Sequence, residues 1–251
     1  MQERVSPSSR APVGADVRTA IAASHLRSLP PEVIAGLTTD ASRLRVPAGS
    51  ILHREGDTSA HVELVVSGLV RVYVTASDGR SMTVRYCRPG ALIGAVSLFA
   101  SPFSLPATIQ AVTDADLLAL RASVVKRAAE SDLRVARALL DELSERVLSF
   151  MTEIPGAFAT VRQRVARHLL DLASERQKGS ELVAAIGQQE LADAVGTVRE
   201  VVVRTLRELR AQDLLRTGRE GIVLLEPDRL AAEAYSGPIG TNVTGDWNSG
   251  R

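Results

Sequence analysis

The segment QQELADAVGTVREVVVRTLREL, residues 188–209, carries the most specific pattern in the chain. Apolar residues recur at helical spacing on both sides of Gly196, where glycine can adopt the positive φ of a tight turn between two helices. Beyond this segment, residues 214–217 and 222–225 form two strand-like runs around a tip bounded by glycines. The order helix, turn, helix and β-hairpin predicts a winged helix-turn-helix.

Three charged side chains of this segment, Arg199, Glu200 and Arg204, are expected to point outward because Val202 and Leu206 anchor the second helix. Arginine can bind guanine through two hydrogen bonds and glutamate can accept one from cytosine, so this helix is predicted to read bases. The second helix is expected to start with Thr197-Val198-Arg199-Glu200, which has the form of a capping box. The alternative to base reading is a merely solvated face, with Glu200 acting only as the capping partner of Thr197. The predicted phosphate contacts are Gln189, Thr197, Arg207, Arg210, Arg216 and Arg219.

Residues 44–120 read instead as short β-segments rich in Val, Ile, Leu and Thr. Gly56, Gly68, Gly79 and Gly90 are spaced 12, 11 and 11 residues apart, which is typical of strand plus turn in a compact antiparallel sandwich or roll. The pair Asp78-Gly79 predicts a two-residue hairpin turn. The region is therefore expected to be all-β.

Helical periodicity returns at about residue 122 and continues from 131 to 154. The apolar residues of the second part follow a heptad pattern, which predicts a coiled coil with a second chain. Packing of the same residues against the chain's own β-domain is the alternative. The pair Pro155-Gly156 is expected to end the helix and form a hinge. The predicted dimer interface consists of Leu133, Ala136, Leu140, Leu143, Val147, Phe150 and Ile154.

Two further helical patterns complete the α+β fold predicted here. One surrounds Pro30 and Pro31, and the other begins at a capping box of Thr160 with Gln163 and is expected to continue to about Lys178. The expected domains are a loose N-terminal tail (1–18), a β-roll domain (19–130), a dimerisation helix (131–155), a winged helix-turn-helix (156–234) and a loose C-terminal tail (235–251).

The composition narrows the class of protein. The 251 residues are 45% hydrophobic and 24% charged with a net charge of +1, as in soluble globular proteins. One cysteine, Cys87, excludes internal disulfides and four-cysteine clusters, and no apolar run approaches membrane-spanning length. The expected location is the cytoplasm. No nucleophile elbow, phosphate-binding loop or metal-ligand spacing is present, so neither an enzyme nor a metal site is predicted.

Four motifs in order resemble the CRP/FNR superfamily of bacterial transcription regulators: PAGSILHREGD (47–57), LVVSGLVRVYV (64–74), RPGALIG (88–94) and QELADAVGTVREVVVRTL (189–206). The resemblance implies a cyclic-nucleotide-binding-type β-roll, a long dimerisation helix and a winged helix. The family's base-reading pattern falls on Arg199, Glu200 and Arg204 and matches the catabolite-activator branch, which implies a two-fold site with TGTGA-like half-sites. Val203 departs from the small or hydroxyl residue usual at its position.

The resemblance also defines a candidate effector pocket. The family's nucleotide cassette has a glutamate for the ribose and an arginine followed by Ser or Thr for the phosphate, but this chain has Ala95 and Leu105-Pro106 there. Cyclic AMP binding by the usual chemistry is therefore disfavoured, because a buried phosphate needs a cation or hydrogen-bond donors. The candidate pocket residues are Gly94, Ala95, Ser97, Leu105, Pro106, Ala107, Thr108 and Ser149.

Haem binding and cysteine oxidation are two other sensing chemistries. Haem is not expected, because the histidines are dispersed and the ligand region of haem-containing relatives has no His or Cys here. Cys87 lies between Arg85 and Arg88 and is a candidate redox site on condition that it is exposed and electropositive.

These patterns predict a homodimeric regulator that binds double-stranded DNA, with RNA polymerase as a further candidate partner and the effector unidentified. Two paired long helices would hold the reading helices about one DNA turn, roughly 34 Å, apart. The alternative is a sensor that acts through protein partners, with the winged helix as its interaction surface.

Overall fold

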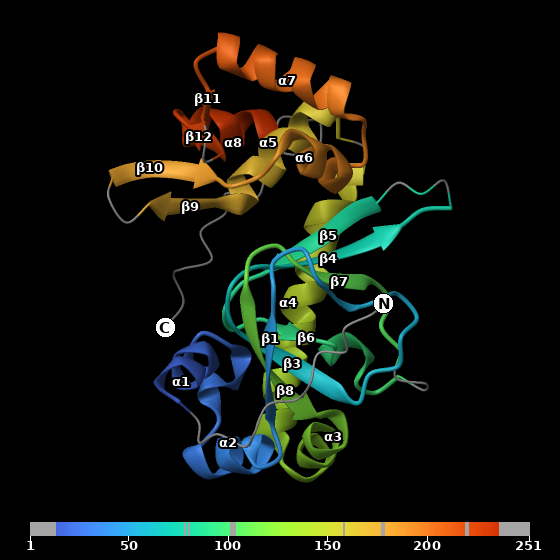
Figure 1. The fold of residues 1–251 in the computed structure, drawn as a ribbon. Helices are drawn as coiled ribbons and strands as arrows, with labels where there is room; N and C mark the ends of the chain where they lie inside the picture. The colour runs from blue at the N-terminus through green and yellow to red at the C-terminus, as the bar shows by residue number, and fades with distance from the viewer. Residues whose placement is uncertain are drawn as a thin grey trace, which may run out of the picture. The chain divides into compact units, whose positions relative to one another are not determined.

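The computed structural model describes residues 14–77, 79, 81–100, 104–157, 159–176, 179–218 and 221–235 (Figure 1). The chain forms two compact units, each considered by itself. The first comprises the chain up to Thr75 together with Thr83–Phe150, and the second comprises Ala76–Met82 together with the chain from Met151 onward. The structure combines α-helices and β-sheets and confirms the α+β class predicted from the sequence.

The first unit is a β-roll accompanied by helices. Its strands are β1 (Ser42–Val46), β2 (Ile51–His53), β3 (His61–Ser67), β4 (Val70–Thr75), β5 (Ser81–Cys87), β6 (Leu92–Ile93), β7 (Thr108–Ala111) and β8 (Ala115–Arg121). Its helices are α1 (Ala15–Ala22), η1 (His25–Ser28), α2 (Pro31–Thr38), η2 (Ala95–Ser97), α3 (Ala122–Ser131) and the greater part of α4 (Leu133–Ala157).

Two four-stranded sheets make the roll, in the orders β1-β8-β3-β6 and β2-β7-β4-β5. Strand β3 is buried along most of its length because both of its faces are covered. Val62 and Leu64 belong to a core shared with the helices, whereas Val65 belongs to a second core shared with residues of both sheets. Successive strand residues point to opposite faces, so this alternation explains the two cores on either side of one strand.

The N-terminal helix α1 was not predicted, since its residues 15–18 fall within the expected loose tail. Val17, Ala20 and Ile21 are buried at helical spacing, and packing of this face stabilises a helix too short to form alone. Arg43 on β1 donates to the carboxylates of Asp116 on β8 and Asp16 in α1, which links this helix to the sheet. The rest of that predicted tail, residues 1–13, lies outside the described residues.

Gly79 has φ +83°, the positive value expected in the predicted hairpin turn, and β4 and β5 are neighbours in one sheet, whereas Asp78 lies outside the described residues. Two local predictions in the first unit need correction. The region expected to be all-β also contains the short helix η2, because Gly94 at φ +86° turns the chain after β6. Helix α4 extends past Pro155 to Ala157, since proline's fixed φ is compatible with helical backbone and the hydrogen bond it removes falls in the last turn.

The second unit contains a helix-turn-helix and a four-stranded sheet of order β11-β12-β10-β9. The strand pair β11–β12 confirms the hairpin expected from the two glycine-bounded runs to within a residue. Its elements are α5 (Val161–Leu172), β9 (Ala173–Arg176), β10 (Gly179–Ala184), α6 (Gln188–Val195), α7 (Arg199–Ala211), β11 (Leu215–Gly218), β12 (Gly221–Leu224) and α8 (Pro227–Tyr235).

The capping box at the start of α5 is present as predicted, with Thr160 and Gln163 bonding reciprocally. The expectation that this helix continues to about Lys178 is wrong, because it ends at Leu172 and the chain enters β9 and β10. Strand β9 replaces the expected end of the helix because it pairs with β10, which in turn pairs with the distant strand β12, and these sheet contacts override the local helical pattern. Helix α8 was not predicted. It includes Tyr235, the first residue of the expected C-terminal tail, whose remainder lies outside the described residues.

Candidate nucleic-acid interface and sensor region

The turn between α6 and α7 depends on Gly196, which adopts φ +67° and ψ +45° at the end of α6. A residue with a Cβ is strained in this left-handed conformation, so glycine is the residue suited to the position. The backbone N–H of Thr197 then donates to the carbonyl of Ala192 at 3.0 Å. Thr197 therefore belongs to the turn and not to the next helix.

The start of α7 differs from the prediction as a consequence. The helix begins at Arg199 and its N-cap is Val198, which has no side-chain capping bond. The capping box expected between Thr197 and Glu200 is therefore wrong. Because Glu200 is not needed for that box, the alternative that it serves only as the capping partner of Thr197 is excluded.

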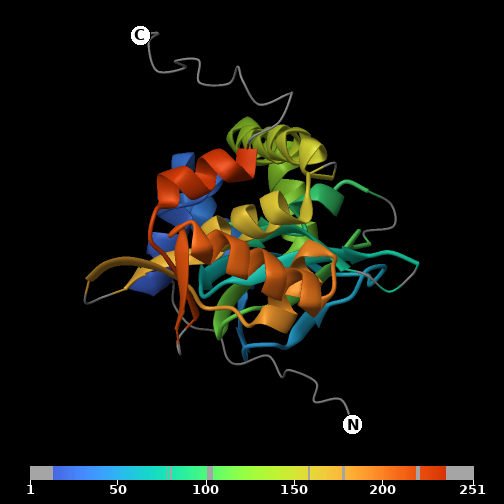
Figure 2. The same cartoon turned by 90° about the horizontal axis from the view of Figure 1, so that it is seen from above.

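Helices α6 and α7 lie side by side (Figures 1 and 2) and pack through apolar residues, as predicted. Leu191 and Ala192 of α6 are fully buried, as are Val202 and Leu209 of α7. Small Ala192 permits the close approach of two helices. This packing determines which side of α7 remains exposed.

The exposed side carries Arg199, Glu200 and Arg204, as the sequence predicted. Within the described part of the chain, none of these three side chains makes a hydrogen bond or ion pair. Arg199 and Glu200 lie in the first turn of α7, and Arg204 lies about one turn further along. Two guanidinium groups and one carboxylate are thus displayed at the start of one helix, available to bind an external ligand.

The predicted phosphate contacts are distributed over neighbouring elements. Gln189, at the start of α6, is exposed and its amide donates to the Asp193 carboxylate at 2.9 Å. Arg207 on α7 is exposed, and Arg210 donates to the Thr217 hydroxyl of β11 at 3.3 Å. Thr197 is half-buried and Arg216 is exposed. Arg219 lies outside the described residues.

Two arginines of α5 that the sequence reasoning missed hold this unit together. The Arg164 guanidinium donates to the carbonyls of Val195 at the end of α6 and of Ala159. Arg162 donates to Glu233 of α8 and to Gln212, the C-cap of α7, both at 2.6 Å. No local pattern marks these arginines, because all of these partners except Ala159 lie far away in the sequence.

The long helix α4 has one buried face and one exposed face within the first unit. Val135, Ala138, Leu139 and Glu142 are buried against that unit. The predicted interface residues occupy the other side: Leu133, Leu140, Val147 and Phe150 are exposed, with Leu133 at 87% and Phe150 at 56%. Ala136 and Leu143 are half-buried, and the side chain of Ile154 is outside the described set. The four exposed residues are therefore not used to cover the chain's own β-roll, whereas Ala136 and Leu143 are partly covered in the single chain.

The candidate effector residues have different surroundings in the structure. Ala95 and Leu105, which replace the family's charged residues, belong to two different apolar cores. Ser97 and Ala107 are buried, Pro106 is exposed, and Gly94 forms the turn before η2. The Thr108 hydroxyl accepts a hydrogen bond from the Glu55 backbone N–H at 3.1 Å, and Ser149 is half-buried on α4.

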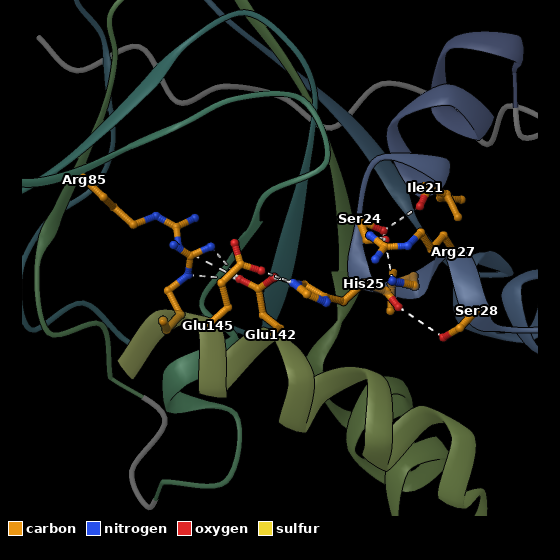
Figure 3. A network of polar contacts seen from close by, with 10 residues as sticks. Ile21, Ser24, His25, Arg27, Ser28, Arg85, Glu142 and Glu145 are labelled. Carbon is orange, nitrogen blue, oxygen red and sulfur yellow. Dashed lines mark hydrogen bonds and ion pairs between the residues drawn. The ribbon is translucent and has the colours of Figure 1, made fainter. Parts of the chain in front are cut away.

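A buried polar network connects η1, β5 and α4 instead (Figure 3). The Glu142 side chain, 3% exposed, accepts hydrogen bonds from Arg146 at 2.8 and 3.0 Å. Arg85 of β5 lies 3.9 Å and His25 of η1 3.7 Å from its carboxylate, and His25 also contacts Glu145 at 2.6 Å. Figure 3 shows these side chains converging from separate elements. No pattern in the sequence indicated this network.

Burial also decides the chemistry of Cys87. Its side chain is 1% exposed, and burial raises the pKa of the thiol, although the Arg85 Nε atom at 2.9 Å opposes this effect. A reactive cysteine needs access and thiolate character. The exposure on which the redox hypothesis was conditional is absent, so the structure disfavours that hypothesis.

A second buried carboxylate, Glu63 on β3, was also not anticipated. It is 1% exposed and contacts His53 of β2 at 2.9 Å, while its Oε2 atom has no hydrogen-bond partner among the described residues. Those residues include no group of three or more His, Cys, Asp and Glu side chains suited to a metal ion. They also include no helix that is both long and apolar enough to span a membrane.

Two family models match the chain. Residues 43–132 match the cyclic nucleotide-binding domain, and residues 163–233 match the Crp-like helix-turn-helix domain. The CRP-like cAMP-activated global transcriptional regulator of Mycobacterium tuberculosis is 28% identical over 224 residues, which cover 84% of this chain and 96% of that protein.

Solved structures show the same likeness. A CRP/FNR-family regulator from Thermus thermophilus matches with a TM-score of 0.64 and 28% identity over 77% of this chain and 98% of its own. The c-di-GMP-responsive global regulator CLP of Xanthomonas campestris matches with a TM-score of 0.66 and 26% identity over 78% and 99%. The fold and the helix-turn-helix define a DNA-binding transcription regulator. The chain belongs to the CRP/FNR family.

The raised pKa of Glu142 predicts how the stability of the folded protein changes with pH. Because burial raises the pKa of its carboxyl in the folded protein, the folded state retains a proton at pH values where the unfolded state has lost it. This contribution to stability is present below the ordinary glutamate pKa and is lost as pH rises through the raised pKa. Glu142→Gln is expected to remove that loss, so the variant gains stability relative to wild type as pH rises above the ordinary glutamate pKa.

The measurement is urea unfolding across this pH range. Asp141→Asn is the matched control, because Asp141 directly precedes Glu142 on α4 and its side chain is 47% exposed. Parallel pH profiles for wild type and Glu142→Gln would contradict the assignment.

Proposed function

We propose that the protein is a homodimeric, sequence-specific regulator that reads a palindromic, TGTGA-like DNA site through α7. The observation that carries this proposal is the display of Arg199, Glu200 and Arg204 on one exposed side of α7, without partners among the described residues. Buried Val202 and Leu209 hold the opposite side of the helix in the core. The proposal places the protein in the cytoplasm without catalytic activity, and retains RNA polymerase as a further candidate partner.

The three side chains supply the chemistry that base reading requires. Each arginine can donate two hydrogen bonds to O6 and N7 of guanine, and Glu200 can accept one from N4 of cytosine. A TGTGA-like half-site contains these bases on its two strands. Arg207 lies beyond these side chains on α7, where it is suited to bind a phosphate group. The proposal therefore divides the helix into base-reading and phosphate-binding residues.

The experiment that tests this division begins with selection of DNA from a random pool, for which we expect enrichment of a palindrome. Arg199→Ala is expected to lower the preference for that palindrome over random DNA about tenfold or more, because one guanine contact contributes about 1–3 kcal/mol. Arg207→Ala, the matched control, should weaken binding to all sequences and reduce its salt dependence. Enrichment of no sequence, or unchanged selectivity in Arg199→Ala, would refute the proposal.

Homodimerisation is supported by the exposed apolar face of α4. This face exposes the large apolar side chains of Leu133, Leu140, Val147 and Phe150 to solvent. Pairing with the same face of a second copy would bury them. A two-fold dimer also explains why the DNA site would be palindromic, because each protomer presents the same α7.

Leu140→Glu is expected to convert the dimer to monomer, because two-fold symmetry places two introduced carboxylates in one apolar interface. The predicted dissociation constant increases at least tenfold, measured by analytical ultracentrifugation. Ser144→Glu, at an exposed position one turn further along the same helix, is the control. A wild-type monomer, or a Leu140→Glu variant that remains dimeric, would argue against this interface.

The effector is proposed to differ from cyclic AMP bound in the usual way. Ala95 and Leu105 lie in separate apolar cores and supply neither a carboxylate for ribose nor a cation for phosphate. Relatives of the chain are described as cAMP-activated in one case and c-di-GMP-responsive in another, so membership of the family does not select one ligand.

Calorimetry of the purified dimer with cyclic AMP, cyclic GMP and c-di-GMP tests the effector proposal. We expect no cyclic AMP or cyclic GMP binding at micromolar concentration, together with measurable DNA affinity of ligand-free protein. Micromolar or tighter binding of cyclic AMP would show that other residues replace the missing cassette.

A further inference from the structure

The N-cap residue of α7, Val198, is unusual for that position. Val198 has extended backbone angles, φ −98° and ψ 153°, and makes no side-chain capping bond. Ser, Thr, Asp and Asn are preferred at an N-cap because their side chains accept a hydrogen bond from the first turn, and valine is among the poorest choices. The helix would be more stable with a polar residue at this position.

Packing does not explain Val198 either. Its side chain is 58% exposed, so much of its apolar surface remains in water. A different valine of the same helix, Val202, is fully buried in the core of the second unit. Neither capping nor burial in the described structure therefore accounts for a branched apolar side chain at residue 198.

The neighbours of Val198 suggest what it contacts. It directly precedes Arg199 and Glu200, the first two of the three residues proposed to read bases. The N-terminal residues of a recognition helix are those that contact base edges in the major groove. Val198 cannot donate a hydrogen bond to a phosphate through its side chain, so it is unsuited to a backbone contact of that kind. The apolar group that the major groove presents is the C5-methyl of thymine.

We propose that Val198 is a specificity-determining residue that packs against the C5-methyl of one thymine in each half-site. This inference rests on the proposed function, since it requires α7 to enter the major groove. It adds an apolar contact to the hydrogen bonds of Arg199, Glu200 and Arg204. A TGTGA-like half-site contains thymines that can provide the methyl group.

Deoxyuridine substitution tests the contact, because it removes the methyl of thymine and leaves every hydrogen-bonding group in place. Each thymine of the selected palindrome is replaced in turn, symmetrically in both half-sites, and affinity is measured for wild type and Val198→Ser. For wild type we expect one position at which uracil weakens binding about fourfold per half-site, the effect of one buried carbon group. Val198→Ser is expected to bind the thymine and uracil duplexes equally at that position.

Thermal unfolding of the same variant separates recognition from folding. Serine can cap the first turn of α7, so Val198→Ser should unfold at the same or a higher temperature than wild type. A loss of methyl sensitivity in a protein of undiminished stability is not expected from a merely structural residue. Val203→Ala, which changes another partly exposed valine of α7, is the matched control and should retain the uracil effect.

The possible outcomes distinguish this inference from the proposed function. Selective binding of a palindrome without any uracil effect would overturn the role of Val198 and leave the proposed function intact. A uracil effect that persists in Val198→Ser, or that disappears in Val203→Ala, would also overturn it. Failure of the wild-type protein to select any DNA sequence would overturn both.

Discussion

The proposed activity depends on one interaction, which is the pairing of two copies of α4. This pairing would use the apolar side chains of α4 that the β-roll leaves uncovered. Leu133, Leu140, Val147 and Phe150 are exposed in a single chain, although each would be more stable out of water. Burying this face against a second copy would create a two-fold axis along the helix. Without that axis, two α7 helices have no fixed separation, and one helix alone would read only half of a palindrome.

The opposite face of α4 packs within the first unit. Val135 and Leu139 are buried in the first unit, and Glu142 continues this face as part of a polar network with Arg85 and His25. A buried charge needs compensating partners, so the geometry of this network is sensitive to movement of β5 or η1. The helix that would pair two protomers is therefore also the helix that contacts strand β5 of the β-roll.

The sequence predicted those features that depend on local patterns. Gly196 and the apolar residues around it identified the helix-turn-helix, and outward placement of Arg199 and Arg204 followed from the burial of Val202. Features that depend on tertiary contacts were missed. Strands β9 and β10 form because β10 pairs with distant β12, and α7 begins one residue later than expected because Thr197 completes the turn after α6.

The Glu142 network could not be predicted for the same reason, since its members come from three elements that only folding brings together. The resemblance located a nucleotide cassette in the sequence, but burial of Ala95 and Leu105 in separate cores became visible only in the structure.

The most direct test of the account is the stoichiometry and affinity of the protein on two duplexes, the selected palindrome and the same duplex with one half-site scrambled. Sedimentation of the complexes, combined with titration, measures both quantities. The account predicts two chains on the palindrome and a loss of affinity of at least tenfold on the scrambled duplex. One chain per duplex, with equal affinity for both, would contradict it.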